Sequence, residues 1–258
     1  MATEQDIIVG VHSIAEAIRN PRRLSLELIA ADEGLVELKK RCGIGARELE
    51  RVKVKILPSH QVQEEAARVF KNFDYQFSRV PSHLYLLTNP IEVFDANWLY
   101  DNVACGKIKK ILCLDQVTDV HNGAAIMRTA AFYGVDALVV SYKGNFGMGP
   151  NFSRIASGAL EHVPVVNCSG LPKLVSKLSD MGAMTIGFSE HEEGADIQPY
   201  PDSPICLVMG AEDVGISNAL MRVVQKKVAF VPYGQIKSLN VSVAAAIAME
   251  RFFTFFKK

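Results

Sequence analysis

Residues 111–141 read ILCLDQVTDVHNGAAIMRTAAFYGVDALVVS, and this stretch decides the fold. Two short apolar runs, ILCL at 111 and ALVVS at 137, flank a longer segment with helical character. Each run is continuously apolar rather than alternating, which is typical of parallel strands that are buried on both faces. The stretch therefore predicts a strand, a helix and a second strand in one parallel sheet.

The same rhythm continues outward from this stretch to the end of the chain. Further apolar runs follow at residues 163 (VPVV), 184 (MTIGF), 205 (ICLVM) and 228 (VAFVP), separated by helical segments. Strands that alternate with helices indicate an α/β domain with helices on both faces of the sheet. We place this domain at residues 106–258.

The first hundred residues have a different pattern. Short apolar runs, IIVG at 7, LELIAA at 26, KILP at 55 and HLYLL at 83, alternate with charged helical segments. The turn signal Asn89-Pro90 follows the last of these runs. We therefore expect a small α/β module over residues 1–88 and a linker over residues 89–105.

Composition and charge exclude several classes of protein. The 258 residues are 49% hydrophobic, and 28 basic side chains balance 28 acidic ones, so the chain is globular and has no strong field for DNA or a membrane surface. The N-terminus lacks the pattern of a signal peptide, and the longest apolar run is far shorter than a membrane span, which predicts a cytoplasmic protein. Its five cysteines are scattered, which argues against disulfides and a metal site and predicts buried thiols.

Polar residues follow three of the predicted strands. Asn122 and Arg128 come after the first strand of the domain, Gly210 and Glu212 after the fifth, and Ser238 and Asn240 after the sixth. Ligands bind at the carboxyl ends of parallel strands. Asn122, Ser238 or Asn240 could equally be simple helix caps, and Glu212 a first-turn carboxylate. We expect all three strands to be neighbours, which favours one shared site. The glycine fingerprints of dehydrogenases and P-loop enzymes do not occur.

Three runs in these loops resemble the successive motifs of the SpoU/TrmH family. They are NGAAIMRTA from Asn122, LVMGAEDVG from Leu207 and SLNVSVAAAI from Ser238, and the segment ASGALEHVPVV at 156 also fits. The first motif has Ala124 where the family usually has Gly. Members of this family are S-adenosylmethionine-dependent RNA ribose 2′-O-methyltransferases.

The resemblance implies a SPOUT fold, in which a parallel α/β sheet ends in a C-terminal trefoil knot. It also implies that S-adenosylmethionine is the cofactor and that it lies in the knot, with no metal. The residues that match the cofactor-binding positions are Phe188, Ser189, Gly210, Val231 and Leu239.

The resemblance makes Arg128 the central catalytic residue. A guanidinium keeps its proton at neutral pH, so we favour a role in gripping the neighbouring phosphate and stabilising the developing alkoxide over a role as base. Asn122 and Glu212 would orient Arg128 or the substrate, while Ser238 and Asn240 would shape the knot and the ribose site. His121 is a weaker candidate for the base, because the motif does not require histidine at that position.

The resemblance also extends to partners. The run VGVHSIAEAI at 9 resembles the start of a ribosomal-protein-like RNA-binding domain found in the rRNA-modifying branch, which favours rRNA over tRNA and a guanosine of the large subunit. The family's homodimers agree with a C-terminal helix that is apolar on all sides. A tRNA enzyme and a catalytically silent RNA-binding protein remain alternatives. The candidate RNA contacts are Arg19, Arg22, Arg23, Lys39, Lys40 and Arg41.

Overall fold

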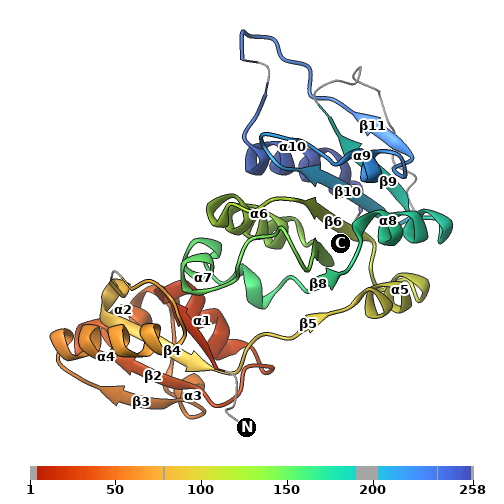
Figure 1. Cartoon of the computed structure of the whole chain (residues 1–258). Helices are drawn as coiled ribbons and strands as arrows, with labels where there is room; N and C mark the ends of the chain where they lie inside the picture. The colour runs from red at the N-terminus through yellow and green to blue at the C-terminus, as the bar shows by residue number, and fades with distance from the viewer. Residues whose placement is uncertain (1–4, 78, 190–202, 237, 257–258) are drawn as a thin grey trace. The chain divides into compact units, whose positions relative to one another are not determined.

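The structure, a computed structural model, describes residues 5–77, 79–189, 203–236 and 238–256 (Figure 1). The chain forms two compact units. The first unit comprises residues 1–91 and 148–162, and the second comprises residues 92–147 and 163–258. No helix in the described part of the chain is long and apolar enough to cross a membrane.

The first unit is built on a four-stranded mixed sheet with the strand order β1-β4-β2-β3. Its strands and helices are β1 (Asp6–Val9), α1 (Val11–Arg19), β2 (Glu27–Ala30), α2 (Asp32–Cys42), α3 (Ala46–Leu49), β3 (Lys53–Ile56), α4 (Ser59–Asn72), the 3-10 helix η1 (Pro81–His83), β4 (Leu84–Thr88), α7 (Pro150–Ala156) and the 3-10 helix η2 (Ala159–Glu161). Neighbouring residues of a strand face opposite sides. Ile8 accordingly packs in one apolar cluster with α1, while Ile7 packs in another with α4.

The second unit is a seven-stranded parallel sheet with the order β11-β9-β10-β6-β7-β8-β5. Its elements are β5 (Val93–Phe94), α5 (Ala96–Ala104), β6 (Lys110–Asp115), α6 (Val120–Tyr133), β7 (Ala137–Ser141), β8 (Val165–Cys168), α8 (Leu171–Asp180), β9 (Met184–Phe188), β10 (Ile205–Gly210), α9 (Asn218–Met221), β11 (Lys226–Val228) and α10 (Val241–Phe253). The first five strands expected from residue 107 onward are confirmed, whereas the sixth, expected over residues 228–232, is displaced: β11 ends at Val228. A fold of this kind places the loops after β6 and β10 side by side, because these strands are neighbours.

The expected linker over residues 89–105 differs from what the structure shows. Residues 93–94 form β5, which pairs in parallel with β8 at the edge of the second sheet. Asp95 caps α5 by accepting a hydrogen bond from the backbone N–H of Trp98 at 2.9 Å, and Leu99 and Val103 of α5 are buried in the sheet's core. This segment is therefore part of the second unit rather than a connection between units.

The segment 148–162 also differs from the expected division of the chain. It lies within the C-terminal half of the sequence, but it packs in the first unit. Ser13 donates a hydrogen bond to the carbonyl oxygen of Ser153 at 2.5 Å, and Asn20 donates to Glu161 at 2.6 Å. The first unit is thus completed by residues that the chain supplies much later.

Arg23, expected on the RNA-binding surface, is instead buried with 0% of its side chain exposed. Its guanidinium bonds Glu161 at 2.7 Å, Asp6 at 2.9 Å and the carbonyl oxygen of Asn89 at 2.7 Å. Burial raises the pKa of the Asp6 carboxyl, although Arg23 acts in the opposite direction. Arg23 is therefore a structural cation that joins η2 to β1, and the expectation that it contacts RNA is wrong.

Replacing Arg23 with methionine is expected to lower the free energy of unfolding by about 3–5 kcal/mol, because Glu161 would be left buried without its charge partner. Arg41→Met is the matched control, since Arg41 pairs with Glu37 at the surface and exposed pairs of this kind contribute about 0–1 kcal/mol. Urea unfolding of both variants measures the difference. Equal midpoints for the two variants would show that the buried network contributes no more than a surface pair.

Two further expectations need correction. The three motif loops do not follow three adjacent strands, because β9 lies between β10 and β11. The cysteines are not all buried: Cys113, Cys168 and Cys206 are, but Cys105 is exposed and Cys42 is half-buried. Burial raises the pKa of Cys206 to about 12, so this thiol stays neutral.

Candidate functional site

Three side chains from the three sequence motifs meet at one end of the second sheet. Asn122 lies in the first turn of α6, Glu212 follows β10, and Asn240 precedes α10. The side-chain amide of Asn240 donates to Oδ1 of Asn122 and to Oε1 of Glu212, each at 3.0 Å. The amide of Asn122 donates to Oε2 of Glu212 at 3.2 Å. We call these three residues the amide–carboxylate cluster.

Helix starts hold two members of the cluster in place. Asp119 caps α6 by accepting a hydrogen bond from the backbone N–H of Asn122 at 2.7 Å. Asn240 caps α10, because its Oδ1 accepts from the backbone N–H of Ser242 at 2.9 Å. The capping alternative is therefore confirmed for Asn240, and the same side chain also bridges Asn122 and Glu212. Asn122 is not the cap of its helix.

The loop after β10 holds Glu212 through close backbone packing. A Cβ atom on Gly210 would lie 2.1 Å from the carbonyl carbon of Gly215, so only glycine fits here. Gly215 adopts a φ of +66° and donates its N–H to the carbonyl oxygen of Ala211 at 2.8 Å. Asp115, at the end of β6, accepts from the backbone N–H of Ser217 at 2.7 Å and fixes the far end of the loop.

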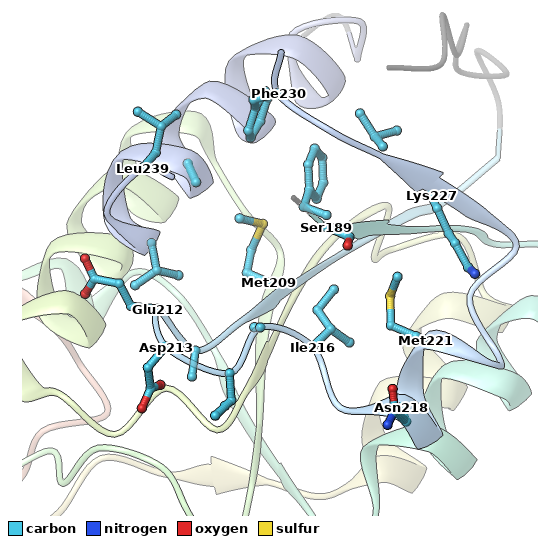
Figure 2. A pocket seen from close by; sticks show the side chains of 18 residues that line it. Ser189, Met209, Glu212, Asp213, Ile216, Asn218, Met221, Lys227, Phe230 and Leu239 are labelled. Atoms are coloured by element: carbon cyan, nitrogen blue, oxygen red, sulfur yellow. The ribbon is translucent and has the colours of Figure 1, made fainter. Parts of the chain in front are cut away.

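A cavity of about 540 Å³ opens beside this loop (Figure 2). Figure 2 shows Phe230 and Leu239 on one side of the cavity, with Ile216 and Met221 on the opposite side. The ring of Phe230 stacks on Phe188 at a centroid distance of 5.3 Å. The lining residues are Phe188, Ser189, Met209 to Ile216, Asn218, Met221, Lys227, Val228, Phe230, Leu239, Val241 and Ala244. A cavity of this size, lined by both apolar and polar groups, suits a small molecule.

A second cavity of about 400 Å³ shares a wall with the first. The shared wall consists of residues 211–213 and Val241, and Asn122 lines only the second cavity. Gln116, with a φ of +59°, turns the chain after β6 so that residues 116–119 line this second space. Glu212 of the amide–carboxylate cluster therefore lies in the wall between the two cavities, and Asn122 beside it lines the second, whereas Asn240 lines neither. Among the described residues, no group of three or more His, Cys, Asp or Glu is arranged to hold a metal ion.

The structure brings together some of the predicted site residues and not others. Phe188, Ser189, Gly210 and Leu239 line the first cavity, but Val231 does not. Arg128 and Ser238 are exposed and line neither cavity. Arg128 is six residues after Asn122, which places it about 120° around the helix and about 9 Å along its axis. Asn122 and Arg128 therefore do not meet within one chain.

Two carboxylates of the site were not predicted from the sequence. Asp119 had a local signal, because an aspartate just before a helix is a common cap. Asp115 had none, since its partner Ser217 is 102 residues away and only the pairing of β6 with β10 brings the two together.

Comparisons with known proteins identify the family of the chain. Residues 109–250 match the model of the SpoU rRNA Methylase family. A Staphylococcus aureus protein assigned to the TrmH family of tRNA/rRNA methyltransferases is 25% identical over 97% of this chain and 96% of its own length. The 23S rRNA (guanosine-2′-O-)-methyltransferase RlmB of Ralstonia nicotianae is 32% identical over 54% of this chain and 56% of its own.

A solved structure has a similar fold. The SpoU methyltransferase AviRb of Streptomyces viridochromogenes, in complex with the cofactor AdoMet, superposes with a TM-score of 0.71 over 97% of this chain and 90% of its own, at 18% identity. At that identity the likeness establishes the fold. The family model covers more than half of the sequence and includes all three motifs, and their three polar side chains meet in the structure. The chain therefore belongs to the SpoU rRNA Methylase family.

Proposed function

We propose that this protein transfers a methyl group from S-adenosylmethionine to the 2′-hydroxyl of a ribose in RNA, a guanosine of large-subunit rRNA. The observation that carries the proposal is the pair of cavities that meet at the amide–carboxylate cluster. A transferase needs donor and acceptor side by side in a fixed geometry. Two cavities with a shared wall provide that arrangement.

The first cavity fits the methyl donor. Its volume of about 540 Å³ suits a small molecule, its stacked Phe188 and Phe230 offer apolar surface, and its loop of residues 210–216 offers backbone groups. When bound, the donor supplies an electrophilic methyl carbon on a sulfonium. The chain's own part is to bind the donor through this loop and to exclude water with Phe230 and Leu239.

A knotted C-terminal segment is part of this proposal. β11 lies at the outer edge of the sheet, whereas Asn240 bonds Asn122 and Glu212 near β6 and β10. The connection over residues 229–240 must therefore return past β9 to reach the cluster. A return of that kind supports the trefoil knot, with the donor cavity between the returning segment and the loop after β10.

The second cavity would take the acceptor ribose. Asn122 and Glu212 present an amide and a carboxylate at its inner wall. The carboxylate can accept a hydrogen bond from a ribose hydroxyl, and the amide can donate one to it or accept one from it. Because their mutual bonds fix both groups before the acceptor arrives, little reorganisation is needed on binding. We assign Asn122, Glu212 and Asn240 the task of orienting the 2′-oxygen, and Ser238 that of shaping the entrance.

Arg128 would act from a dimer interface. Arg128 and Phe132 are four residues apart on α6 and so share a face, and Phe132 is 83% exposed. α10, which packs beside α6, exposes Val243 and Ile247. Exposed apolar side chains of this kind mark an interface. A second copy on this face would hold Arg128 at the interface, where it can grip an RNA phosphate and stabilise the developing alkoxide.

The first unit supports rRNA over tRNA as the substrate. It adds a complete small domain to the methyltransferase unit, and the Staphylococcus aureus relative matches across both. With Arg23 buried, Lys39 and Lys40 of α2 are exposed candidates for contacts with RNA phosphates. A tRNA ribose is the second candidate, because that relative's name includes both substrates.

Calorimetry with S-adenosylmethionine and with S-adenosylhomocysteine tests the donor site. We expect both compounds to bind the full chain with one site per protomer, and light scattering on the same sample to give the mass of a dimer. A folded chain that binds neither compound would contradict the donor site. A monomer that binds both would contradict only the dimer and the role given to its interface.

A further inference from the structure

Gly123 leaves room for an aromatic ring from a distant loop. A Cβ atom on Gly123 would lie 2.3 Å from Cδ1, 2.5 Å from Cγ and 2.7 Å from Cε1 of Phe146. Phe146 is 3% exposed, so its ring is enclosed and has little freedom to move aside. The ring and the bare backbone of Gly123 therefore fit each other closely.

This contact lies directly beside the amide–carboxylate cluster. Gly123 follows Asn122 in the first turn of α6, and both backbone N–H groups bond Asp119, at 3.0 Å and 2.7 Å. The side chain of Asn122 reaches Asn240 at 3.0 Å and Glu212 at 3.2 Å. Because hydrogen bonds weaken steeply beyond these lengths, a shift of the turn by about 1 Å would break both.

The loop that carries Phe146 is tied to the end of β7. Asn145, next to Phe146, donates a side-chain hydrogen bond to the carbonyl oxygen of Ser141.

We propose that Phe146 is a positioning residue: its ring packs on Gly123 and holds Asn122 in the amide–carboxylate cluster. The expected effect on the methylation rate rests on the proposed function, whereas the expected effect on the position of Asn122 does not.

Reciprocal substitutions test the contact. Gly123→Ala adds a methyl group where the ring lies, and Phe146→Leu removes ring atoms from that space. Alanine is favoured over glycine in a helix by about 1 kcal/mol, so a loss in Gly123→Ala cannot come from helix propensity. We expect Gly123→Ala to lower kcat about 10- to 100-fold, which is the scale of a displacement near 1 Å in an active site. In the double variant Gly123→Ala/Phe146→Leu, we expect kcat to be at least about tenfold higher than in Gly123→Ala alone.

The assay uses tritiated S-adenosylmethionine and total RNA from cells that lack this protein, with hydrogen exchange of residues 120–128 measured in the free chain. Gly123→Ala should speed exchange there, and the double variant should slow it again. Donor affinity by calorimetry should stay constant. Leu178→Ala, a truncation in the buried face of α8, is the control for a general loss of stability: it should speed exchange throughout the second unit, whereas Gly123→Ala should speed it mainly at residues 120–128. If the loss of kcat in the double variant equals the product of the losses in the two single variants, the two substitutions act independently and the proposed contact is wrong.

If the exchange results hold while the wild type methylates no RNA, the proposed function fails and the positioning of Asn122 stands.

Discussion

Replacing Arg128 with alanine is expected to slow methyl transfer at least about 100-fold and to leave the affinity for S-adenosylmethionine unchanged. Removal of one group that stabilises developing charge has an effect of this size. Arg128 is exposed on α6 and lines neither cavity, so donor binding should not depend on it. The proposal therefore assigns it to the RNA side of the reaction.

Steady-state kinetics with saturating donor, together with calorimetry, separate these two effects. Lys173→Ala is the matched control, because Lys173 is an exposed cation of the same unit on α8. It should retain the rate of the wild type. An Arg128→Ala variant that keeps near-full turnover would refute the role of this residue, and a variant that loses donor affinity as well would place it at the donor site instead.

Gly210→Ala is expected to weaken donor binding at least about 100-fold, which corresponds to about 2.8 kcal/mol. The new Cβ would lie 2.1 Å from the carbonyl carbon of Gly215 and 2.2 Å from the backbone nitrogen of Ile216. Neither atom belongs to a flexible side chain, so the backbone of residues 211–216 must move. That backbone forms one wall of the first cavity.

Calorimetry with S-adenosylhomocysteine measures the change, and thermal unfolding shows whether the variant is folded. Gly170→Ala is the control, because a Cβ on Gly170 meets no atom within 4 Å and the residue lies outside the cavity. We expect Gly170→Ala to bind as the wild type does. Unchanged affinity in a folded Gly210→Ala variant would show that this loop does not form the donor site.

The larger elements of the fold could be predicted from the sequence, because hydrophobic runs report burial directly. Five of the six apolar runs after residue 107 contain strands of the parallel sheet, whereas β11 precedes the sixth run and shares only Val228 with it. β5 could not be predicted, since it has only two residues and depends on the edge of β8 for its hydrogen bonds. The placement of residues 148–162 in the first unit depends on contacts such as that of Arg23 with Glu161, 138 residues apart, which no local pattern reveals.

These long-range contacts change how the chain can be divided. A fragment that starts at residue 106 would lack β5 and α5, which complete the second sheet and its core. It would also carry residues 148–162 without the first unit that buries Ser153 and Glu161. The division of labour between a module of residues 1–88 and a domain of residues 106–258 therefore remains a proposal that variants of the full chain test better than truncation.

The site could be predicted only in part, because its geometry also depends on contacts between residues that are far apart in the sequence. The motifs identify Asn122, Glu212 and Asn240, but taken alone Asn122 or Asn240 could be a simple helix cap and Glu212 a first-turn carboxylate. Only the folded chain shows that their side chains bond one another. The separation of Arg128 from Asn122 follows from helix geometry, whereas the role that we propose for Arg128 depends on a second copy of the chain that no sequence pattern places.

Mapping of ribose 2′-O-methylation in total RNA tests the central proposal most directly. The RNA comes from cells with the protein, without it, and with the Arg128→Ala variant in its place. We predict one guanosine of large-subunit rRNA that is methylated only with the wild type. A site that appears in tRNA instead would contradict the rRNA assignment, and identical methylation patterns in all three RNAs would contradict the proposed activity itself.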